Sequence, residues 1–500
     1  MTASVGFAKV LDAVLTYGHE EHSQRSIKSL TGAAAATVRK GLQPFAGHEP
    51  LLLAKPIRFS PEMGLVLAFS VGSESVRAGL VDANGEIHYR HSAPAGNDQL
   101  SQSPEALLDR VRHQAIRVLE DAFESGKLLR KTDGTLPLLG AALALPAPVD
   151  RDHILRGRAL THEGWNTRSS GGERVSLNNR LSALLGPPFQ PETAQVMNDC
   201  NAAAVAIAFE CVREREPPRK AGAPREHERT MAMVVRVSGG VGAGMIEIAG
   251  DSEHAHVSRF LKSRVMVGTN GLAGELGHLP ISRSAIERIN DASKSIEGLA
   301  PLEWNSICTC GEKHHLQALV GWKALCERLG LPTEGPETRT SLLEKYINPQ
   351  PGQESQAAVR ALEDAGRIIG RALTGTVLAL DPHSITVLGA LAGPNLLHGL
   401  ASASDEWSNA LWRGRKVAFE KPRHGSTYVS LRGAGLALIR AQRHRKLREI
   451  GAGRFGGLTP LLPYSQAHFE ALRDAEIAPF AAEAPPPDGA DMATVPMFSS

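Results

Sequence analysis

Cysteine is scarce in this sequence, with five residues in a chain of 500. So few cysteines cannot form the disulfide framework that stabilises small secreted domains. Cys308 and Cys310 are separated by one residue, and this spacing is more typical of metal ligands than of a structural disulfide. We therefore expect a cytoplasmic protein with a candidate metal site.

The chain also lacks a surplus of charge of either sign and any long apolar run. Its formal net charge is +2, so no global electrostatic field indicates nucleic acid or membrane as a partner. No segment approaches the roughly 18 apolar residues of a membrane span. The N-terminus carries Lys9 inside an amphipathic pattern and does not resemble a signal peptide. We expect no membrane partner, and any contact with nucleic acid must come from a local patch.

What is present is an ordinary composition for a globular protein, with 42% hydrophobic and 22% charged residues. Because 500 residues exceed what one hydrophobic core usually serves, we expect two or three domains.

The first 60 residues predict a small helical domain. Apolar residues recur at helical spacing over 7–17, from Ser23 to Gly32, and over about 33–45, which is the helix-turn-helix pattern. The apolar segment 51–59 fits a wing hairpin. This region holds seven Lys or Arg and four acidic residues, a balance that suits phosphate contacts. The alternative is a three-helix module for dimerisation or packing.

The third of these helices offers little for reading base edges, because it begins with four alanines, 33–36. Alanine can touch a thymine methyl group but cannot form bidentate hydrogen bonds. The candidate DNA-binding residues are Thr37, Arg39 and Lys40.

Residues 64–448 alternate buried strands with helices. Strands are predicted at 65–71, 76–82 and 138–145, with a hairpin turn at Asn84-Gly85 and a helix over about 103–125. A second strand pair is predicted at 231–237 and 245–248, joined by a glycine turn at 238–244. Residues 72–75 form the matching turn between the first two strands. Two such turns, facing each other across a cleft, could hold phosphates with backbone N–H groups.

Two further stretches carry polar side chains suited to ligand binding. Asn198 and Asp199 end a predicted strand and open a helix at 202–211, where ligands bind in α/β sheets. Residues 268–278 (GTNGLAGELGH) combine four glycines with Glu275 and His278. If a helix begins near Leu272, these two side chains share a face and can bind a polyol or a metal. The alternative is a glycine-rich loop with a surface Glu and a satisfied His.

The remaining segments contain fewer signals. We expect an exposed loop at 213–229, a second insertion with little sequence signal at about 281–306, a late strand at 385–388 and a closing helix from 433 to about 448. The tail 451–500 is rich in Ala, Pro and Gly, and we expect it to be disordered.

Six short segments together resemble one family, the ROK family (repressor, open reading frame, kinase). They are 145–150 (LPAPVD), 164–166 (GWN), 198–201 (NDCN), 239–244 (GGVGAG), 268–278, and 308–311 (CTCG). They occur in the family order over 64–448, and 1–60 resembles the helix-turn-helix of its transcriptional-regulator branch. The resemblance implies an α/β fold of two lobes, the actin-like ATPase (duplicated ribonuclease-H-like) fold, preceded by a small, mostly α winged helix-turn-helix domain.

The resemblance also implies roles for single residues. In family kinases the Asp matching Asp199 is the general base that takes the proton of the sugar hydroxyl attacking ATP. The implied sugar-binding residues are Asn198, Asp199, Glu275, His278 and Gln317. The implied nucleotide-binding residues are Gly72, Gly239, Gly240, Gly242 and Gly389.

A structural zinc site is implied as well. Its ligands in this sequence would be His278, Cys308, Cys310 and His315, because His315 stands where the family has a third cysteine. His314 could compete with His315 for this role. The alternative is two buried thiols beside surface histidines.

The sequence departs from the family kinases at the first phosphate turn. Their Asp-x-Gly-Gly-Thr motif reads here Ser70, Val71, Gly72, Ser73 and Glu74, which removes one carboxylate and places another where phosphates should bind. Ala147 and Ala390 replace two family glycines.

We therefore expect a sugar-responsive transcriptional regulator. It would bind a sugar or sugar phosphate and an operator DNA, as a homodimer or homotetramer. One alternative is an ATP-dependent sugar kinase that uses Mg-ATP with Asp199 as base. The other is a sugar-binding protein with neither activity.

Overall fold

The computed structural model describes residues 64–475, with gaps at 73–74, 95–102, 126–132, 156–175, 215–229, 249–259, 261–262, 333–344, 347–348, 350–351, 353–354, 412–417, 421, 423–426 and 452–461. The expected helix-turn-helix, with Thr37, Arg39 and Lys40, lies outside the described residues. So do Ser73, Glu74, the segment 164–166 and most of the expected insertion 213–229.

The first lobe is built on a mixed sheet with strand order β11-β4-β1-β2-β3, in which β5 also pairs with β4. Its strands are β1 (Leu65–Val71), β2 (Ser75–Val81), β3 (Ile87–Pro94), β4 (Leu136–Leu145), β5 (Ala194–Asn198) and β11 (Leu462–Tyr464). β1 runs parallel to β4 and antiparallel to β2. Every residue of β1 and β4 is buried, because helices cover both faces of the sheet, and this explains their continuous apolar runs.

The helices of this lobe include α4 (Pro104–Glu124) and α5 (Leu177–Leu185), which share one core with the sheet. Both begin at a serine N-cap, Ser103 and Ser176.

The second lobe repeats the arrangement in a sheet of order β10-β9-β6-β7-β8. Its strands are β6 (Thr230–Val237), β7 (Val241–Ile248), β8 (Arg264–Val265), β9 (Ser384–Leu388) and β10 (Ala418–Glu420). The antiparallel pair β6–β7 with parallel β9 corresponds to β1–β2 with parallel β4. This duplication confirms the expected two-lobed α/β architecture.

Helices pack on the second sheet and complete its core. They are α8 (Arg283–Ser293), α9 (Leu316–Val320), α10 (Trp322–Arg328), α12 (Gln356–Leu380) and α13 (Pro394–Leu411).

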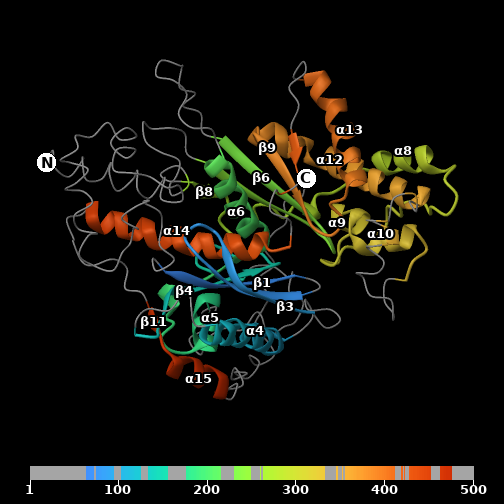
Figure 1. Cartoon of the computed structure of the whole chain (residues 1–500). Coiled ribbons are helices and arrows are strands. Elements are labelled where there is room, and N and C mark those ends of the chain that lie inside the picture. The colour runs from blue at the N-terminus through green and yellow to red at the C-terminus, as the bar shows by residue number, and fades with distance from the viewer. Residues whose placement is uncertain are drawn as a thin grey trace, which may run out of the picture.

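Two helices, α6 (Asp199–Glu214) and α14 (Val429–Gly451), lie against each other between the two sheets (Figure 1). α14 contacts β1 and β4 of the first lobe, and α6 contacts β6 and β7 of the second. The two helices approach closely at Gly433, where an added Cβ would overlap the carbonyl oxygen of Ala202.

The structure corrects the expected tail. Part of the segment 451–500 is ordered, because β11 pairs with β4 and is followed by α15 (Gln466–Asp474). Tyr464, Phe469 and Leu472 are buried in the first-lobe core. The burial of these three large side chains orders the segment, although the sequence around it is rich in Ala, Pro and Gly.

The structure also refines three other expectations. The insertion 281–306 contains α8, which buries Ile286 and Ile289 in the second-lobe core. The glycine turn at 238–244 is shorter than expected, since β7 already begins at Val241. No helix begins near Leu272; a single 3-10 turn, η6 (Leu276–His278), follows the glycine loop.

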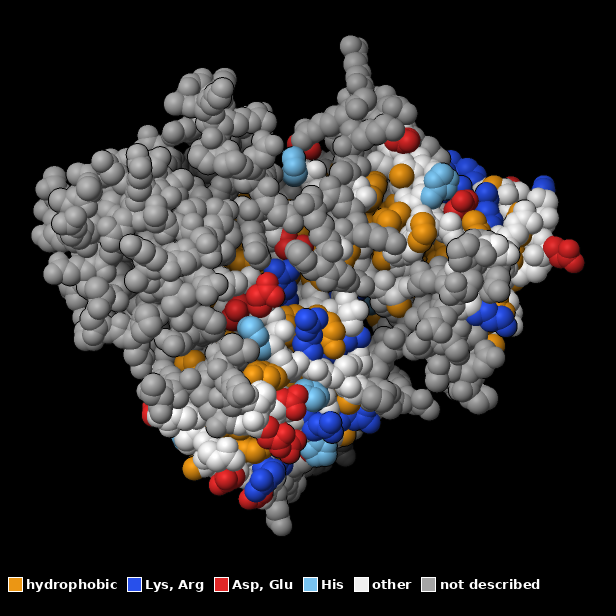
Figure 2. All heavy atoms as spheres, viewed as in Figure 1, with side chains coloured by type: hydrophobic (Ala, Val, Ile, Leu, Met, Phe, Trp, Pro, Cys, Tyr) orange, Lys and Arg blue, Asp and Glu red, His pale blue; other side chains and the backbone are white. Residues whose placement is uncertain are grey.

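None of the helices in the described part of the chain is both long and apolar enough to span a membrane. Basic and acidic side chains are interspersed on the described surface visible in Figure 2, in agreement with the balanced composition.

Candidate functional site in the interlobe cleft

Asn198 and Asp199 lie where β5 ends and α6 begins, as expected. The buried Asn198 side chain caps the helix, since its Oδ1 accepts hydrogen bonds from the backbone N–H groups of Cys200 (2.9 Å) and Asn201 (3.1 Å). Its Nδ2 donates to the carbonyl of Ala147 at 3.1 Å. Asn198 therefore fixes the geometry of this corner.

The Asp199 carboxylate is buried and lies 3.4 Å from Nη1 of Arg236, on β6. Arg236 also donates through Nη2 to Oγ of Ser430 at 2.6 Å, and the Ser430 hydroxyl donates to the backbone carbonyl of Asp199 at 2.8 Å. The network thus joins α6, β6 and α14. Sequence reasoning missed Arg236, although a single charge in the otherwise apolar strand segment 230–237 was a visible signal.

Glu275 faces Asp199 from the second lobe. It follows Gly274, whose φ of +101° and close approach to the carbonyl oxygen of Ala243 leave no room for a Cβ. Burial, followed by the negative charge of Asp199, raises the pKa of Glu275 to about 7. The Glu275 carboxyl therefore has an increased proton affinity beside the Asp199 carboxylate.

His278 connects this cleft to a second group of side chains. Its Nε2 lies 3.9 Å from Oε2 of Glu275. Its Nδ1 lies 3.7 Å from Sγ of Cys308 and 3.5 Å from Nδ1 of His315. Burial, followed by the neighbouring His315, lowers the pKa of His278, which favours the neutral imidazole that metals bind.

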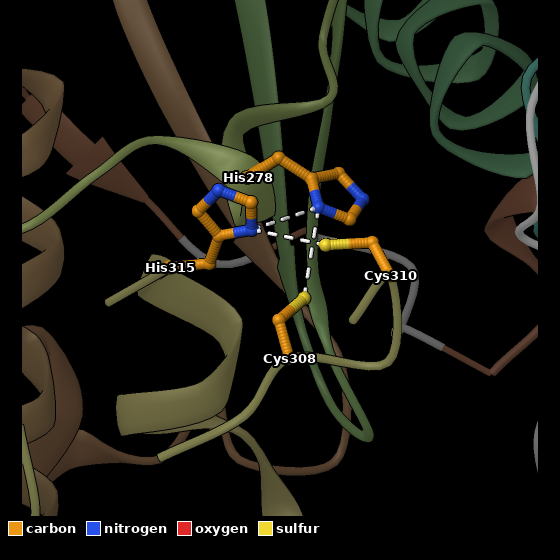
Figure 3. A group of neighbouring side chains, drawn as sticks. All are labelled: His278, Cys308, Cys310 and His315. Carbon is orange, nitrogen blue, oxygen red and sulfur yellow. Dashed lines mark hydrogen bonds between the residues drawn. The ribbon is translucent and has the colours of Figure 1, made fainter. Parts of the chain in front are cut away.

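His278, Cys308, Cys310 and His315 form a compact candidate metal centre (Figure 3). Their ligand atoms all lie within 4.8 Å of one another, and Cys310 Sγ is 3.1 Å from His315 Nδ1. Bond lengths to tetrahedral zinc place ligand atoms about 3.3–3.8 Å apart, so the four side chains fit such an ion. The alternative of two buried thiols is wrong for Cys310, which is exposed.

The local chain explains why His315 rather than His314 joins this group. His314 has a φ of +65° and stacks on Trp304 with ring centroids 3.6 Å apart. Its Nδ1 lies 2.9 Å from the carbonyl oxygen of Trp304. His315, the N-cap of α9, is left to face the cysteines.

Gln317 lies beside the metal ligands. Its Nε2 donates to Cys308 Sγ and to Thr309 Oγ1, both at 2.8 Å. In this position it would orient the Cys308 sulfur toward a bound metal, as the groups that hydrogen-bond to metal ligands commonly do. Its contact with a sugar stays a prediction.

The glycines expected to bind nucleotide are only partly brought together. Gly239 and Gly240 form the β6–β7 turn, and a Cβ on Gly389 would overlap the Val237 carbonyl oxygen beside that turn. Gly242 lies within β7, where a Cβ would be 3.0 Å from Sγ of Cys200. In the first lobe, the N–H of Gly72 already donates to the carbonyl of Ser75 at 2.9 Å.

Comparison with known proteins identifies the family. The ROK family model matches residues 66–439, well over half of the chain. The chain belongs to the ROK family. A search of curated proteins finds no match.

Several solved structures share the ROK fold. One is a ROK family transcriptional regulator described as a homologue of the E. coli MLC protein, at 15% identity and a TM-score of 0.51, covering 89% of this chain and 100% of its own. A ROK family glucokinase from Streptomyces griseus in complex with glucose and AMPPNP has 17% identity, a TM-score of 0.48 and coverage of 74% and 98%. A ROK hexokinase from Thermus thermophilus has 20% identity, a TM-score of 0.45 and coverage of 74% and 97%.

Proposed function

We propose that this ROK protein is a sugar-responsive transcriptional regulator that binds a sugar or sugar phosphate in the cleft of Asp199, Glu275 and His278. Carboxylate and imidazole groups are suitable partners for the hydroxyls of a sugar. They come from both lobes, so a bound sugar would favour a closed arrangement of the lobes. The likeness to the regulator of the MLC type extends over 89% of this chain, which is consistent with a regulator.

The ion pair between Arg236 and Asp199 is the observation that favours a regulator over a kinase. A general base must accept the proton of the attacking hydroxyl. If Asp199 took up this proton, Arg236 would remain as an uncompensated cation in a largely buried position, which is strongly unfavourable. Ser70, buried at the end of β1, replaces the carboxylate that the family kinases use near the phosphates.

A sugar kinase is the second candidate, because Asp199 and the Gly239–Gly240 turn are both present. In that case Asp199 would act as base with Mg-ATP as co-substrate.

The two candidates are separated by assaying the full-length protein for ADP release with Mg-ATP and a panel of hexoses and N-acetylhexosamines. A regulator gives no turnover above background, while one of the sugars raises the melting temperature without ATP. Sugar-dependent turnover that disappears in Asp199→Asn would establish the kinase. Arg236→Met removes the cation that pairs with Asp199, so it tests directly whether this ion pair prevents Asp199 from acting as a base.

We further infer that residues 1–60 bind operator DNA and that the protein acts as a homodimer or homotetramer. A gel shift with the promoter of its own gene should weaken with salt and with Arg39→Ala or Lys40→Ala. The sugar identified in the panel should change the affinity of the protein for this promoter DNA. Binding no better than to random DNA would instead favour a sugar-binding protein with neither activity.

We also propose that the metal of the four-residue centre is zinc with a structural role, because two thiolates and two imidazoles are a common zinc ligand set. Elemental analysis of the purified protein should find one zinc per chain. Cys308→Ser should lose it, whereas Cys326→Ser, which changes a buried cysteine outside the centre, should retain it. Zinc at background level in the wild type would rule the site out.

A further inference from the structure

A cavity, which we call the junction cavity, lies between β5 and β8, the strands at the ends of the two sheets. Its volume is about 410 Å³, within the range of small-molecule sites. Its wall comes from the loop after β4, from β5, α6 and β8, and from Arg440 of α14. Asp199, Glu275 and His278 are not among its described lining residues, but Asn198 and Asn201 are, so the junction cavity adjoins the sugar cleft at the start of α6.

The junction cavity carries an excess of positive charge. Arg151, Arg264 and Arg440 line it, and the acidic residue among its described lining is Asp150. One oxygen of Asp150, Oδ1, accepts hydrogen bonds from the backbone N–H groups of Asp152 and Ile154, each at 2.9 Å. The charge of the wall therefore favours an anionic ligand.

Arg440 is the most distinctive of these cations. Its Nη1 donates to the carbonyl of Ser263 at 3.2 Å, and its guanidinium lies 5.9 Å from the ring centre of Phe260. No carboxylate in the described part of the chain pairs with it, and burial lowers its pKa to about 10. A half-buried cation whose described neighbours are a carbonyl and an aromatic ring is suited to a ligand that brings the negative charge.

Two residues of the cavity wall carry acceptors without a hydrogen-bond partner. Asn201 is 2% exposed, and its Oδ1 has no hydrogen-bond partner. Oε1 of Gln195 is also buried without a partner. Buried polar atoms are nearly always hydrogen-bonded, so both oxygens are suited to donors such as ligand hydroxyl groups.

We propose that the junction cavity binds a small hydroxylated anion, with Arg440 meeting the anionic group and Asn201 and Gln195 accepting hydrogen bonds from the hydroxyls. A sugar carboxylate and a sugar phosphate share this chemistry. Because the wall belongs to both lobes, an occupant would bias the arrangement of the lobes and act as an effector of the sugar cleft. This proposal does not depend on whether the protein is a regulator or a kinase.

The test is binding of glucuronate, glucose 6-phosphate, glucose and inorganic phosphate to the full-length protein, measured by calorimetry and thermal shift. Arg440→Met removes the cation while keeping a long side chain, and Asn201→Asp places a repelling carboxylate in the first turn of α6, where the helix tolerates it. The matched control is Arg283→Met, on the exposed face of α8 outside the cavity. Glu275→Gln reports separately on the sugar cleft.

We expect one of the two hydroxylated anions to bind more tightly than glucose or inorganic phosphate. Its dissociation constant should rise at least tenfold in Arg440→Met and in Asn201→Asp, and remain unchanged in Arg283→Met and Glu275→Gln. Binding of glucuronate would identify a carboxylate as the anionic group, and binding of glucose 6-phosphate would identify a phosphate. The proposal fails if neither binds, if inorganic phosphate binds equally well, or if binding is lost in Glu275→Gln but kept in both cavity variants. If Arg440→Met does not fold, Asn201→Asp decides alone.

Discussion

Glu275 lies between the Asp199 carboxylate and the His278 imidazole, and its environment opposes its ionisation. Burial and the charge of Asp199 raise its pKa from 4.5 to about 7. The protonated form can donate a hydrogen bond and the ionised form can only accept. The protonation state of this residue therefore changes how the cleft meets a hydroxyl group within the physiological range of pH.

This shift predicts a pH-dependent difference in stability between the wild type and Glu275→Gln. Because the pKa is higher in the folded than in the unfolded state, the folded state binds more protons between pH 4.5 and 7. The stabilising contribution is complete below the unfolded pKa and is lost as the pH rises through about 7. The wild type should therefore lose stability relative to the variant between pH 5 and pH 8, by on the order of 2 kcal/mol.

Urea denaturation of both proteins at four pH values within this range measures the effect. The control is Glu287→Gln, which changes an exposed glutamate paired with Arg283 on α8. Parallel stability curves for the wild type and Glu275→Gln would mean that Glu275 ionises freely in the folded protein.

Single residues also show the limits of the sequence. His278, Cys308, Cys310 and His315 were identified from their order along the chain, and the structure gathers all four. The choice between His314 and His315 depended on a stacking partner, Trp304, that lies ten residues before His314 and carries no motif. Arg236 was missed because its partner Asp199 is distant in sequence and only the folding of β6 beside α6 brings them together.

At the scale of elements, β11 and α15 show how the last part of the chain contributes to the first lobe. Phe123 of α4 lies 5.6 Å from Phe469 and 6.3 Å from Tyr464, between ring centres. Nη2 of Arg112, also on α4, donates to the carbonyl of Leu472 at 2.6 Å. β11 extends the sheet beyond β4, so the segment closes one end of the core.

Removal of this segment should therefore destabilise the first lobe. A chain ending at residue 461 loses three buried side chains, Tyr464, Phe469 and Leu472, and each buried side chain of this size contributes about 1.5–3 kcal/mol. We expect the free energy of unfolding to fall by more than about 4 kcal/mol. The control chain ends at residue 480 and keeps β11 and α15. Equal denaturation midpoints for the two chains would contradict the packing described here.

The regular elements were largely predictable from sequence, whereas β11 and α15 were not. β1, β4 and β6 read as apolar runs because their residues are buried on both faces. Residues 462–475 combine three core residues with polar neighbours in a stretch dominated by Ala, Pro and Gly. Their burial depends on a partner sheet more than 300 residues earlier in the chain, which local composition does not report.

At the scale of the whole molecule, the two lobes meet through the crossing of α6 and α14. Asp199 begins α6 and Ser430 lies at the start of α14, so this crossing also positions the cleft. The duplicated strand pattern predicted two lobes, but the crossing was not predicted, because it depends on three glycines at positions of close approach, two against backbone atoms and one against a side chain. These are Gly244 against Cys200, Gly433 against Ala202, and Gly435 against Val81.

Gly433→Ala should therefore affect both lobes at once. The new Cβ would overlap the carbonyl oxygen of Ala202, and backbone atoms can only yield if α6 and α14 move apart. We expect a loss of about 2–4 kcal/mol in the free energy of unfolding, the range of strongly overpacked core variants, together with weaker sugar binding, since Asp199 moves with α6.

The matched control is Gly375→Ala, in the exposed part of α12, where an added Cβ meets no atom within 4 Å. Alanine has the higher helix propensity, so this variant should be more stable by about 0.5–1 kcal/mol. Chemical denaturation of both variants, with the sugar thermal shift as the second readout, tests the crossing. If Gly433→Ala gains stability like Gly375→Ala, the helices have room between them, and the coupling of the two lobes must arise elsewhere than in this contact.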